Sequence, residues 1–268
     1  MTLEELQKRG FQIEFRSHAE AILTLDFSTA LQELEATLQS LTIPIEEIIG
    51  SGGGETKGTQ RLRRALSELD WNKGMFEIKK TINERVFESQ SHTIDHVKKF
   101  DAGTIALEIE WNNKDPFFDR DLENFKRLHA EGAISVGVIV TRGITMQEQM
   151  RELVMRFAAE KGLMRIEDLA ALGLAPTLRQ RSDYTRRARR PGTSFAQAWA
   201  NSFVQDKYGA ATTHWRKLED RIHRGVGNPC PLLLIGLPSD LVTFNESAEA
   251  IQDLMEEATQ STDDDNNP

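Results

Sequence analysis

Cysteine is almost missing from this chain, since Cys230 is the only one among 268 residues. A single cysteine can form neither an internal disulfide nor a cysteine metal cluster. Long apolar runs are missing as well, and none approaches the roughly eighteen residues that a membrane span needs. Residues 1–5 show no basic region followed by an apolar stretch, as a secretory signal peptide would. We therefore expect a soluble cytoplasmic protein without a membrane segment.

Basic residues are outnumbered, and the formal net charge is −9 at pH 7. The excess acid is unevenly placed, however. Residues 246–268 contain eight acidic side chains and no basic ones, which accounts for all but one unit of the net charge. Residues 176–224 contain eleven Lys and Arg against four Asp and Glu. Because a polyanion responds to local surface charge, the composition allows a nucleic-acid partner without demonstrating one.

The hydrophobic pattern predicts an α/β chain. We expect helices at 27–41, 59–69, 119–131 and 145–160, where apolar residues recur at helical spacing. We expect antiparallel strands between 75 and 111, and buried strands at 134–140 and 230–237. The strand that ends near 111, the helix after it and the strand 134–140 form a crossover unit. Those two strands should therefore be parallel neighbours.

A glycine-rich segment, 50–54, precedes Lys57. It is not a phosphate-binding loop, because the lysine does not follow the last glycine and no Ser or Thr comes directly after it. Two interpretations stay open: a flexible connection that approaches DNA, or an unspecialised loop.

Three acidic residues occupy the strand region at informative positions. Residues 101–103 supply a turn, and a hairpin that folds symmetrically about it pairs positions that sum to about 203. Asp95 would then face Glu108, with Cβ atoms roughly 5 Å apart, and Glu110 would point to the same side. Carboxylates so close together repel each other, and a hard divalent cation, usually magnesium, would hold them together. The alternative is that they only form a solvated face.

The segment 179–190 concentrates six arginines around Tyr184 without an apolar stripe. These are Arg179, Arg181, Arg186, Arg187, Arg189 and Arg190. Guanidinium groups suit phosphates and guanine edges, so the segment is a candidate DNA-binding element. A disordered or subunit-binding segment is the alternative, and base contacts from residues 212–215 are a further option.

Other polar residues have ordinary interpretations. His92 and His96 are four residues apart, but in a strand they merely share a face, which favours structural roles. Asp119 and Asp121 stand where the helix after residue 116 begins, which favours helix capping over metal binding.

With these residues in view, the chain resembles the BglII/BamHI group of type II restriction endonucleases. The resemblance lies in three runs: IDHVK at 94–98, ALEIEWNNKDPFFDRDL at 106–122 and GVIVTRG at 137–143. It is strongest over residues 50–145. It implies the PD-(D/E)XK nuclease fold, in which helices flank a central mixed β-sheet.

The resemblance also implies roles for individual residues. Asp95 and Glu108 would be metal ligands, although the interval between them is long enough that Asp101 is a rival to Asp95. Glu110 would take a place that most relatives fill with Lys, where it would orient or deprotonate a water or bind a second metal. The group has an earlier polar residue at its site, for which Asn72 is our candidate, with Glu77 and Glu84 as alternatives.

From this we expect a Mg²⁺-dependent enzyme that cuts double-stranded DNA at a palindromic site and acts as a homodimer. We expect residues 1–245 to form a single endonuclease domain, with a catalytic core at about 50–160 and a DNA-recognition segment at about 176–228. Residues 246–268 would be an acidic, disordered tail. The alternatives are a structure-dependent or repair nuclease with the same metal core, and a non-catalytic DNA-binding protein.

Overall fold

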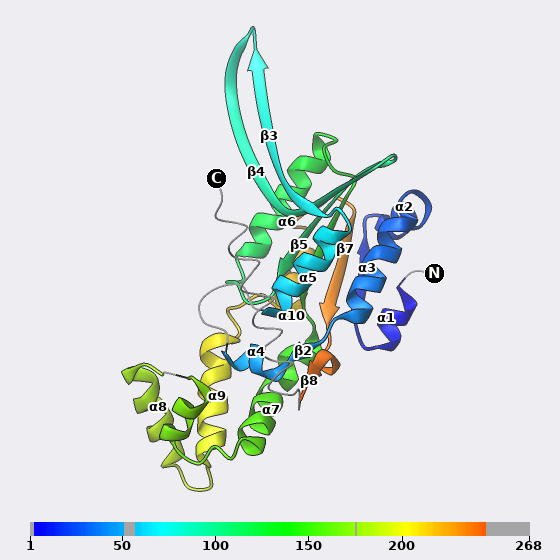
Figure 1. Ribbon diagram of the computed structural model, residues 1–268. Coiled ribbons are helices and arrows are strands. Elements are labelled where there is room, and N and C mark those ends of the chain that lie inside the picture. The colour runs from blue at the N-terminus through cyan, green and yellow to red at the C-terminus, as the bar shows by residue number, and fades with distance from the viewer. Residues whose placement is uncertain (1–2, 51–56, 175, 245–268) are drawn as a thin grey trace. The chain divides into compact units, whose positions relative to one another are not determined.

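The computed structural model describes residues 3–50, 57–174 and 176–244 (Figure 1). Contacts between residues divide the chain into two compact units that alternate along the sequence. The first unit contains Met1–Ser40, Leu62–Gly143 and Thr213–Leu237, and the second contains Leu41–Arg61, Ile144–Thr212 and Pro238–Pro268. Most of the glycine-rich segment and all of the acidic stretch 246–268 fall outside the described residues, so what we expect of them stays a prediction.

A six-stranded mixed β-sheet forms the centre of the first unit. In spatial order its strands are β1 (Gln12–Arg16), β7 (Leu232–Leu237), β6 (Val136–Arg142), β5 (Gly103–Glu110), β4 (Arg85–Phe100) and β3 (Asn72–Ile82). Strands β7, β6 and β5 are parallel, and the remaining pairs are antiparallel. The α/β class, the mixed sheet and the parallel pairing of β5 with β6 are therefore confirmed. Every residue of β6 and β7 is buried, as expected for central strands covered on both faces.

Helices cover both faces of this sheet. They are α1 (Glu4–Lys8), α2 (Ala19–Asp26), α3 (Ser28–Ser40), most of α5 (Lys57–Glu68), α6 (Phe117–Ala130) and α10 (Trp215–His223). Lys98 of β4 forms an ion pair with Glu33 of α3 and stands opposite Ile105 of β5. Glu110 lies five residues beyond Ile105, so it points to the other face, where α6 packs. The two faces of β5 therefore meet α3 on one side and α6 on the other.

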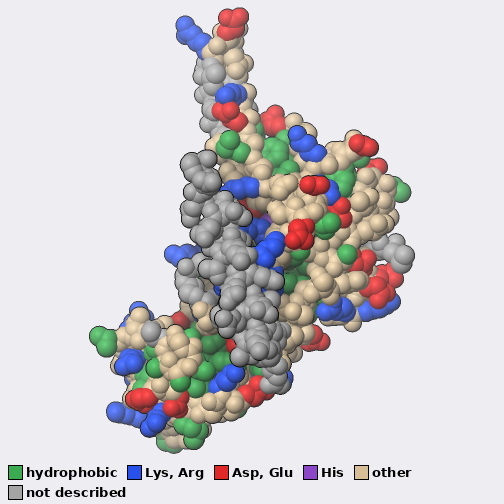
Figure 2. All heavy atoms as spheres, viewed as in Figure 1, with side chains coloured by type: hydrophobic (Ala, Val, Ile, Leu, Met, Phe, Trp, Pro, Cys, Tyr) green, Lys and Arg blue, Asp and Glu red, His purple; other side chains and the backbone are tan. Residues whose placement is uncertain are grey.

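The β3–β4 hairpin extends well beyond the rest of the sheet (Figure 1). Its pairing is interrupted by register shifts between Asn72 and Gly74 and between Lys80 and Thr81. The projecting part carries charged side chains of both signs (Figure 2), among them Lys79 and Glu77, whose charged groups are 2.8 Å apart. Where its side chains are described, the surface of the hairpin is therefore mixed in charge rather than basic.

The second unit is mostly helical. Its elements are α4 (Ile45–Gly50), the long α7 (Ile144–Glu160), a 3₁₀ helix (Ile166–Leu172), α8 (Leu178–Ala188), α9 (Phe195–Lys207), a second 3₁₀ helix (Ser239–Leu241) and a two-stranded parallel sheet of β2 (Ile43–Pro44) and β8 (Val242–Thr243). Aromatic rings join its helices: Trp199 of α9 lies 6.4 Å from Phe157 of α7 and 5.5 Å from Phe203, between ring centroids. Helix α8 packs on α9, and Tyr184 of α8 is buried.

The basic segment 179–190 was expected to lack an apolar stripe, and it buries only one side chain, that of Tyr184. It forms α8, which begins at a capping box of Thr177 and Gln180 and buries Tyr184. The four helices expected from hydrophobic spacing are present as α3, α5, α6 and α7. In the part of the chain that the structure describes, no helix combines the length and apolarity needed to cross a membrane.

Candidate active site

Asp95 and Glu108 meet across the β4–β5 hairpin. The observed register pairs His96 with Leu107 and Lys99 with Thr104, so that paired positions sum to 203 as predicted. The next position along the strands brings Asp95 to Glu108, and their carboxyl groups are within hydrogen-bonding contact. Asp95 is exposed, whereas Glu108 is only 2% exposed. One carboxyl of the pair therefore faces solvent and the other lies beneath it.

Glu110 and Asp121 form a second carboxyl pair beside the first. Glu110, at the end of β5, and Asp121, on α6, are both buried, and their side chains are within hydrogen-bonding contact. Asn113 donates its Nδ2 hydrogen to Glu110 Oε2 at 2.8 Å. Arg120 donates from Nε to Asp121 Oδ1 at 2.8 Å, and its Nη2 lies 3.5 Å from Glu110 Oε1. The half-exposed Arg120 therefore contacts both acids of this buried pair.

Burial and mutual repulsion control the charge of this cluster. Desolvation raises the pKa of Glu108 far above the usual range, and the nearby Asp121 and Asp95 raise it further. Desolvation and Asp121 likewise raise the pKa of Glu110, against the lowering effects of Asn113 and Arg120. The pKa of Asp121 is also raised by burial, which outweighs the opposing effect of Arg120. Burial therefore favours the protonated forms of Glu108 and Glu110.

Backbone contacts fix the end of β5 that carries Glu110. Thr141 of β6 donates its hydroxyl to the Glu110 carbonyl at 2.7 Å. The buried Arg142 donates from Nε to the Trp111 carbonyl and from Nη2 to the Thr213 carbonyl, each at 2.7 Å. The acidic side chains therefore project from a rigid strand end rather than from a mobile loop.

Comparison with known proteins identifies the family of this chain. The family model described as restriction endonuclease BglII/BglIII matches residues 11–237, which is most of the sequence. The chain belongs to this family. It is a type II restriction endonuclease, which hydrolyses double-stranded DNA at specific sites. A comparison with curated proteins finds no match. The matched range is wider than the region of strongest resemblance, residues 50–145, and includes segments of both units.

The remaining candidate residues of this BglII-family enzyme are Asn72, Asp101, Glu77 and Glu84. Asn72, the proposed earlier polar residue, stands opposite Val97 on β3, is exposed, and accepts a hydrogen bond from Ser67 at 3.2 Å. Asp101, the rival to Asp95, is exposed at the hairpin turn, six residues along the chain from Asp95. Glu77 and Glu84 lie on the β3–β4 hairpin, and Glu77 pairs with Lys79.

The histidines and the two aspartates of α6 have distinct surroundings. His92 and His96 are buried, and desolvation lowers the pKa of His96 to about 4, so it is neutral at physiological pH. Neither Asp119 nor Asp121 caps α6, because the residue at the N-cap is Pro116 and no side chain accepts a capping bond there. Asp119 pairs with Arg221 of α10 at 3.2 Å. The capping interpretation was therefore wrong for both residues.

Asp121 is the residue that the sequence reasoning missed. A signal was present, because Asp121 lies three residues after Phe118 and four before Phe125, within the stripe that α6 buries. An acid at an apolar position of an amphipathic helix has to meet a partner inside the protein.

The donor set of the site consists of oxygens, which suits a hard divalent cation, the kind of cofactor that restriction endonucleases generally use. Among the residues that the structure describes, no three His, Cys, Asp or Glu side chains are arranged to hold a metal ion as they stand. The observation that favours a cation is the Oδ2 atom of Asp121, which is buried and receives no hydrogen bond from a donor among the described residues.

The six arginines of the basic segment lie on or just after α8, in the second unit. All are exposed except Arg187, which is half-buried. Arg186 and Arg187 form ion pairs with Asp183, which also accepts a hydrogen bond from Ser202 at 2.6 Å. The other four arginines make no ion pair with any residue that the structure describes.

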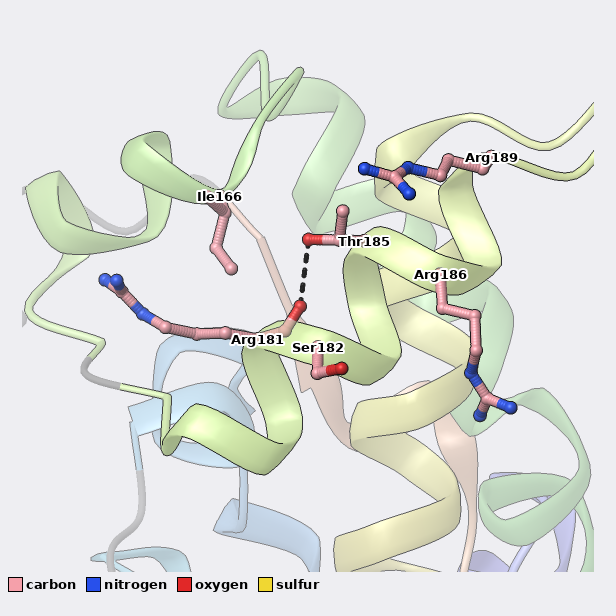
Figure 3. A pocket seen from close by; sticks show the side chains of 6 residues that line it. All are labelled: Ile166, Arg181, Ser182, Thr185, Arg186 and Arg189. Atoms are coloured by element: carbon pink, nitrogen blue, oxygen red, sulfur yellow. Dashed lines mark hydrogen bonds between the residues drawn. The ribbon is translucent and has the colours of Figure 1, made fainter.

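A pocket on α8 is lined by Ile166, Arg181, Ser182, Thr185, Arg186 and Arg189 (Figure 3). In that view Arg181 and Arg186 extend to opposite sides of the helix. Their positive charge is therefore spread along α8 rather than focused on one point. Of residues 212–215, considered above as base readers, the last three are buried, and Thr213 Oγ1 accepts a hydrogen bond from the backbone N–H of Asn113 at 3.1 Å.

Proposed function

We propose that this endonuclease cuts DNA with Mg²⁺ held by Asp95 and Glu108. The contact between these two carboxyls carries the proposal, because an exposed acid and a buried acid meet at a rigid hairpin. Two carboxylates leave most coordination positions to water and phosphate, as Mg²⁺ prefers. Asp95 stands on the solvent side, where a phosphate would approach, and Asp101 at the turn does not share that contact.

When bound, the metal would polarise the scissile phosphate and lower the pKa of a coordinated water. Glu110 would orient or deprotonate that water, since its carboxyl is positioned by Asn113 and Arg120 and is two residues from Glu108. Asn72 would contribute a neutral polar group at the start of β3. No covalent intermediate is required.

DNA would be held in part by Arg179, Arg181, Arg186, Arg187, Arg189 and Arg190. The guanidinium groups of Arg181 and Arg186 extend to opposite sides of α8 (Figure 3), which suits a row of backbone phosphates better than a single anion. Arg186 and Arg187 already have Asp183 as a partner, so Arg179, Arg181, Arg189 and Arg190 would supply most of the contacts.

The proposal also includes an oligomeric state, a kind of target and a location. The enzyme would act as a homodimer on a palindromic DNA site, in the cytoplasm and with Mg²⁺ as its cofactor. Each chain contains one carboxylate cluster of this kind among its described residues, and a duplex presents two strands to cut. A two-fold axis places two identical sites on symmetry-related phosphates. Sedimentation with a short specific duplex in Ca²⁺ should give two chains per duplex.

Plasmid digestion tests the central claim. Wild-type protein with Mg²⁺ should produce discrete fragments, and EDTA or the Glu108→Gln substitution should abolish them. The Glu123→Gln protein, changed at a half-exposed position of α6 where Glu123 pairs with Lys126, is the control and should cut normally. Fragments that persist in EDTA would contradict the metal mechanism. Diffuse degradation would contradict site-specific cleavage.

A further inference from the structure

The carboxyl of Glu110 is held by two side chains that come after it in the chain. Asn113 donates to its Oε2 at 2.8 Å, and Arg120 Nη2 lies 3.5 Å from its Oε1. Asn113 belongs to the connection between β5 and α6, and Arg120 stands in the first turn of α6. The position of the Glu110 carboxyl therefore depends on how the start of α6 is fixed against the end of β5.

Helix α10 and the residues just before it hold this connection at two places. At the first, the Thr213 N–H donates to the Asn113 carbonyl at 2.8 Å, and Thr213 Oγ1 accepts from the Asn113 N–H at 3.1 Å. At the second, Arg221 Nη2 lies 3.2 Å from Asp115 Oδ2, and Arg221 Nε donates to Asp119 Oδ2 at 3.2 Å. One of these aspartates precedes α6 and the other lies in its first turn. Arg221 therefore holds α6 at the point where the helix begins.

Every nitrogen of the Arg221 guanidinium has a partner inside the protein. Arg221 is 7% exposed, and its Nη1 donates to the Lys217 carbonyl at 3.2 Å, while Nε and Nη2 contact the two aspartates. Lys217 Nζ also lies 3.1 Å from Asp115 Oδ2, so Asp115 has a second cation beside it. What Arg221 adds is geometry, because a planar guanidinium orients two carboxylates relative to each other and a lysine ammonium does not.

Stability alone does not account for this arrangement. The desolvation of a buried ion pair often offsets its Coulomb attraction, so such pairs contribute little net stability. Burial acts to raise the pKa of Asp115, but the hydrogen bond of Lys217 and the charge of Arg221 hold it below its usual range, so this acid is charged at neutral pH. In some proteins charged networks of this kind are retained because they specify one arrangement of the elements that they join.

We propose that Arg221 is a positioning residue for DNA cleavage. By holding Asp115 and Asp119 it sets the start of α6 against the end of β5, and this places Asn113 and Arg120 on the Glu110 carboxyl. The inference rests on the proposed function, because it acts through the role of Glu110 in orienting or deprotonating the water. Arg221 touches neither DNA nor the reacting atoms in this role.

The test measures kcat and KM for a duplex with one mapped cleavage site, well below the melting temperature of each protein. Arg221→Gln should lower kcat by roughly tenfold to a hundredfold, the cost of a small misplacement at the reacting atoms, and leave KM and the affinity for DNA in Ca²⁺ unchanged. Arg221→Lys should recover only part of this loss, because an ammonium cannot orient both acids. Arg224→Gln is the matched control, since Arg224 pairs with Asp220 at 3.0 Å between exposed side chains of α10, and it should cut at the wild-type rate.

Two further proteins distinguish positioning from a general structural role. Asp119→Asn changes a side chain that is 45% exposed, so it keeps the inference testable if Arg221→Gln does not fold. It should also lower kcat, and the two substitutions together should cost no more than Arg221→Gln alone, because they remove the same contact. In a Glu110→Ala protein, Arg221→Gln should have no further effect on kcat.

Several outcomes would overturn the inference. A lower melting temperature with unchanged kcat would make Arg221 merely structural, and a change confined to KM would make it a DNA contact. Full recovery in Arg221→Lys would show that charge suffices without the planar group. A loss from Arg221→Gln that adds in full to that of Glu110→Ala would overturn the inference and leave the proposed role of Glu110 standing. Full activity in Glu110→Ala would overturn both.

Discussion

Asp95 and Glu108 belong to adjacent antiparallel strands, and their carboxyl groups are in contact although one is exposed and the other is 2% exposed. The rigidity of this pair comes from backbone pairing, since Val97–Ala106 and Lys98–Ile105 continue the same ladder. Removing either carboxyl therefore changes the chemistry of the site without removing a ladder hydrogen bond.

Asp95→Ala and Glu108→Ala should each abolish cleavage while DNA binding largely persists. Loss of a metal ligand removes several kcal/mol of transition-state stabilisation, which corresponds to a rate lower by on the order of a thousandfold or more. The arginines of α8 are untouched, so affinity in Ca²⁺ should stay close to that of wild type. Digestion rates and gel-shift affinities measure the two quantities separately.

Asp101→Ala is the control for this pair, because Asp101 is the other acid that the sequence allows as a ligand. Asp101 is exposed at the turn, and its removal should leave cleavage near the wild-type rate. A protein that loses activity with Asp101→Ala and keeps it with Asp95→Ala would transfer the ligand role to Asp101.

Glu110 should respond differently to its replacements. Glu110→Ala removes the carboxyl that Asn113 and Asp121 contact and should impair cleavage severely, by roughly a hundredfold or more, within the range for a lost proton-transfer group. Glu110→Lys introduces an amine that can pair with Asp121, and the family resemblance implies a Lys at this place, so part of the activity should survive. Single-turnover rates distinguish the two. Full activity in Glu110→Ala would remove this residue from the site.

The sheet and the paired acids were predictable because they follow local rules. Period-two patterning and a short turn determine the register of β4 and β5, and that register places Asp95 against Glu108. The parallel neighbour of β5 followed from the crossover rule. The buried strand 232–237 could be recognised from its apolar run alone.

Asp121 and Tyr184 could not be placed in the same way, because their environments depend on tertiary packing. Asp121 was expected at the helix start, whereas α6 begins at Phe117 and turns Asp121 toward the sheet. Tyr184 was grouped with the arginines, but its side chain is buried, and the helix that carries it packs on α9. The division into two interleaved units also depends on contacts between distant segments, which no local pattern encodes.

Asp183 should give α8 a measurable pH dependence of stability. The hydroxyl of Ser202, then Arg186 and Arg187, lower the pKa of Asp183 to about 2, against an unfolded value near 3.9. A depressed pKa stabilises the folded state above about pH 4, and that contribution disappears as the pH falls toward 2. Asp183→Asn should therefore melt at a lower temperature than wild type at pH 7, with the gap closing between pH 4 and pH 2.

The measurement is thermal melting of the two proteins across that pH range. Asp168→Asn serves as a comparison in the same unit, since Asp168 accepts bonds from the Met164 and Arg165 backbone and also has a lowered pKa. A gap for Asp183→Asn that is constant with pH would show that its ion pairs contribute nothing to stability.

The arginines of α8 provide the last prediction, which concerns how affinity depends on salt. Arg179, Arg181, Arg189 and Arg190 are exposed and make no ion pair with the described residues, so their removal takes no packing from the fold. Each phosphate that a cation neutralises releases counterions, and the slope of log affinity against log salt is about −0.9 per contact on duplex DNA. Replacing all four by Ala should weaken binding in Ca²⁺ and flatten this slope by up to about 3.6 if each contacts one phosphate.

The control replaces Arg156 and Arg165 by Ala, because both lie in the same unit and already pair with Glu160 and Asp168. This control should leave the slope unchanged. If lowering the positive charge of the unit were enough to flatten the slope, the control protein would show a flatter slope as well. If one of the four instead reads a guanine, its single replacement should cost about 1–3 kcal/mol at one base pair and relax sequence choice there. A slope that stays the same in the quadruple variant would place α8 off the DNA and direct the search for recognition residues to 207–228.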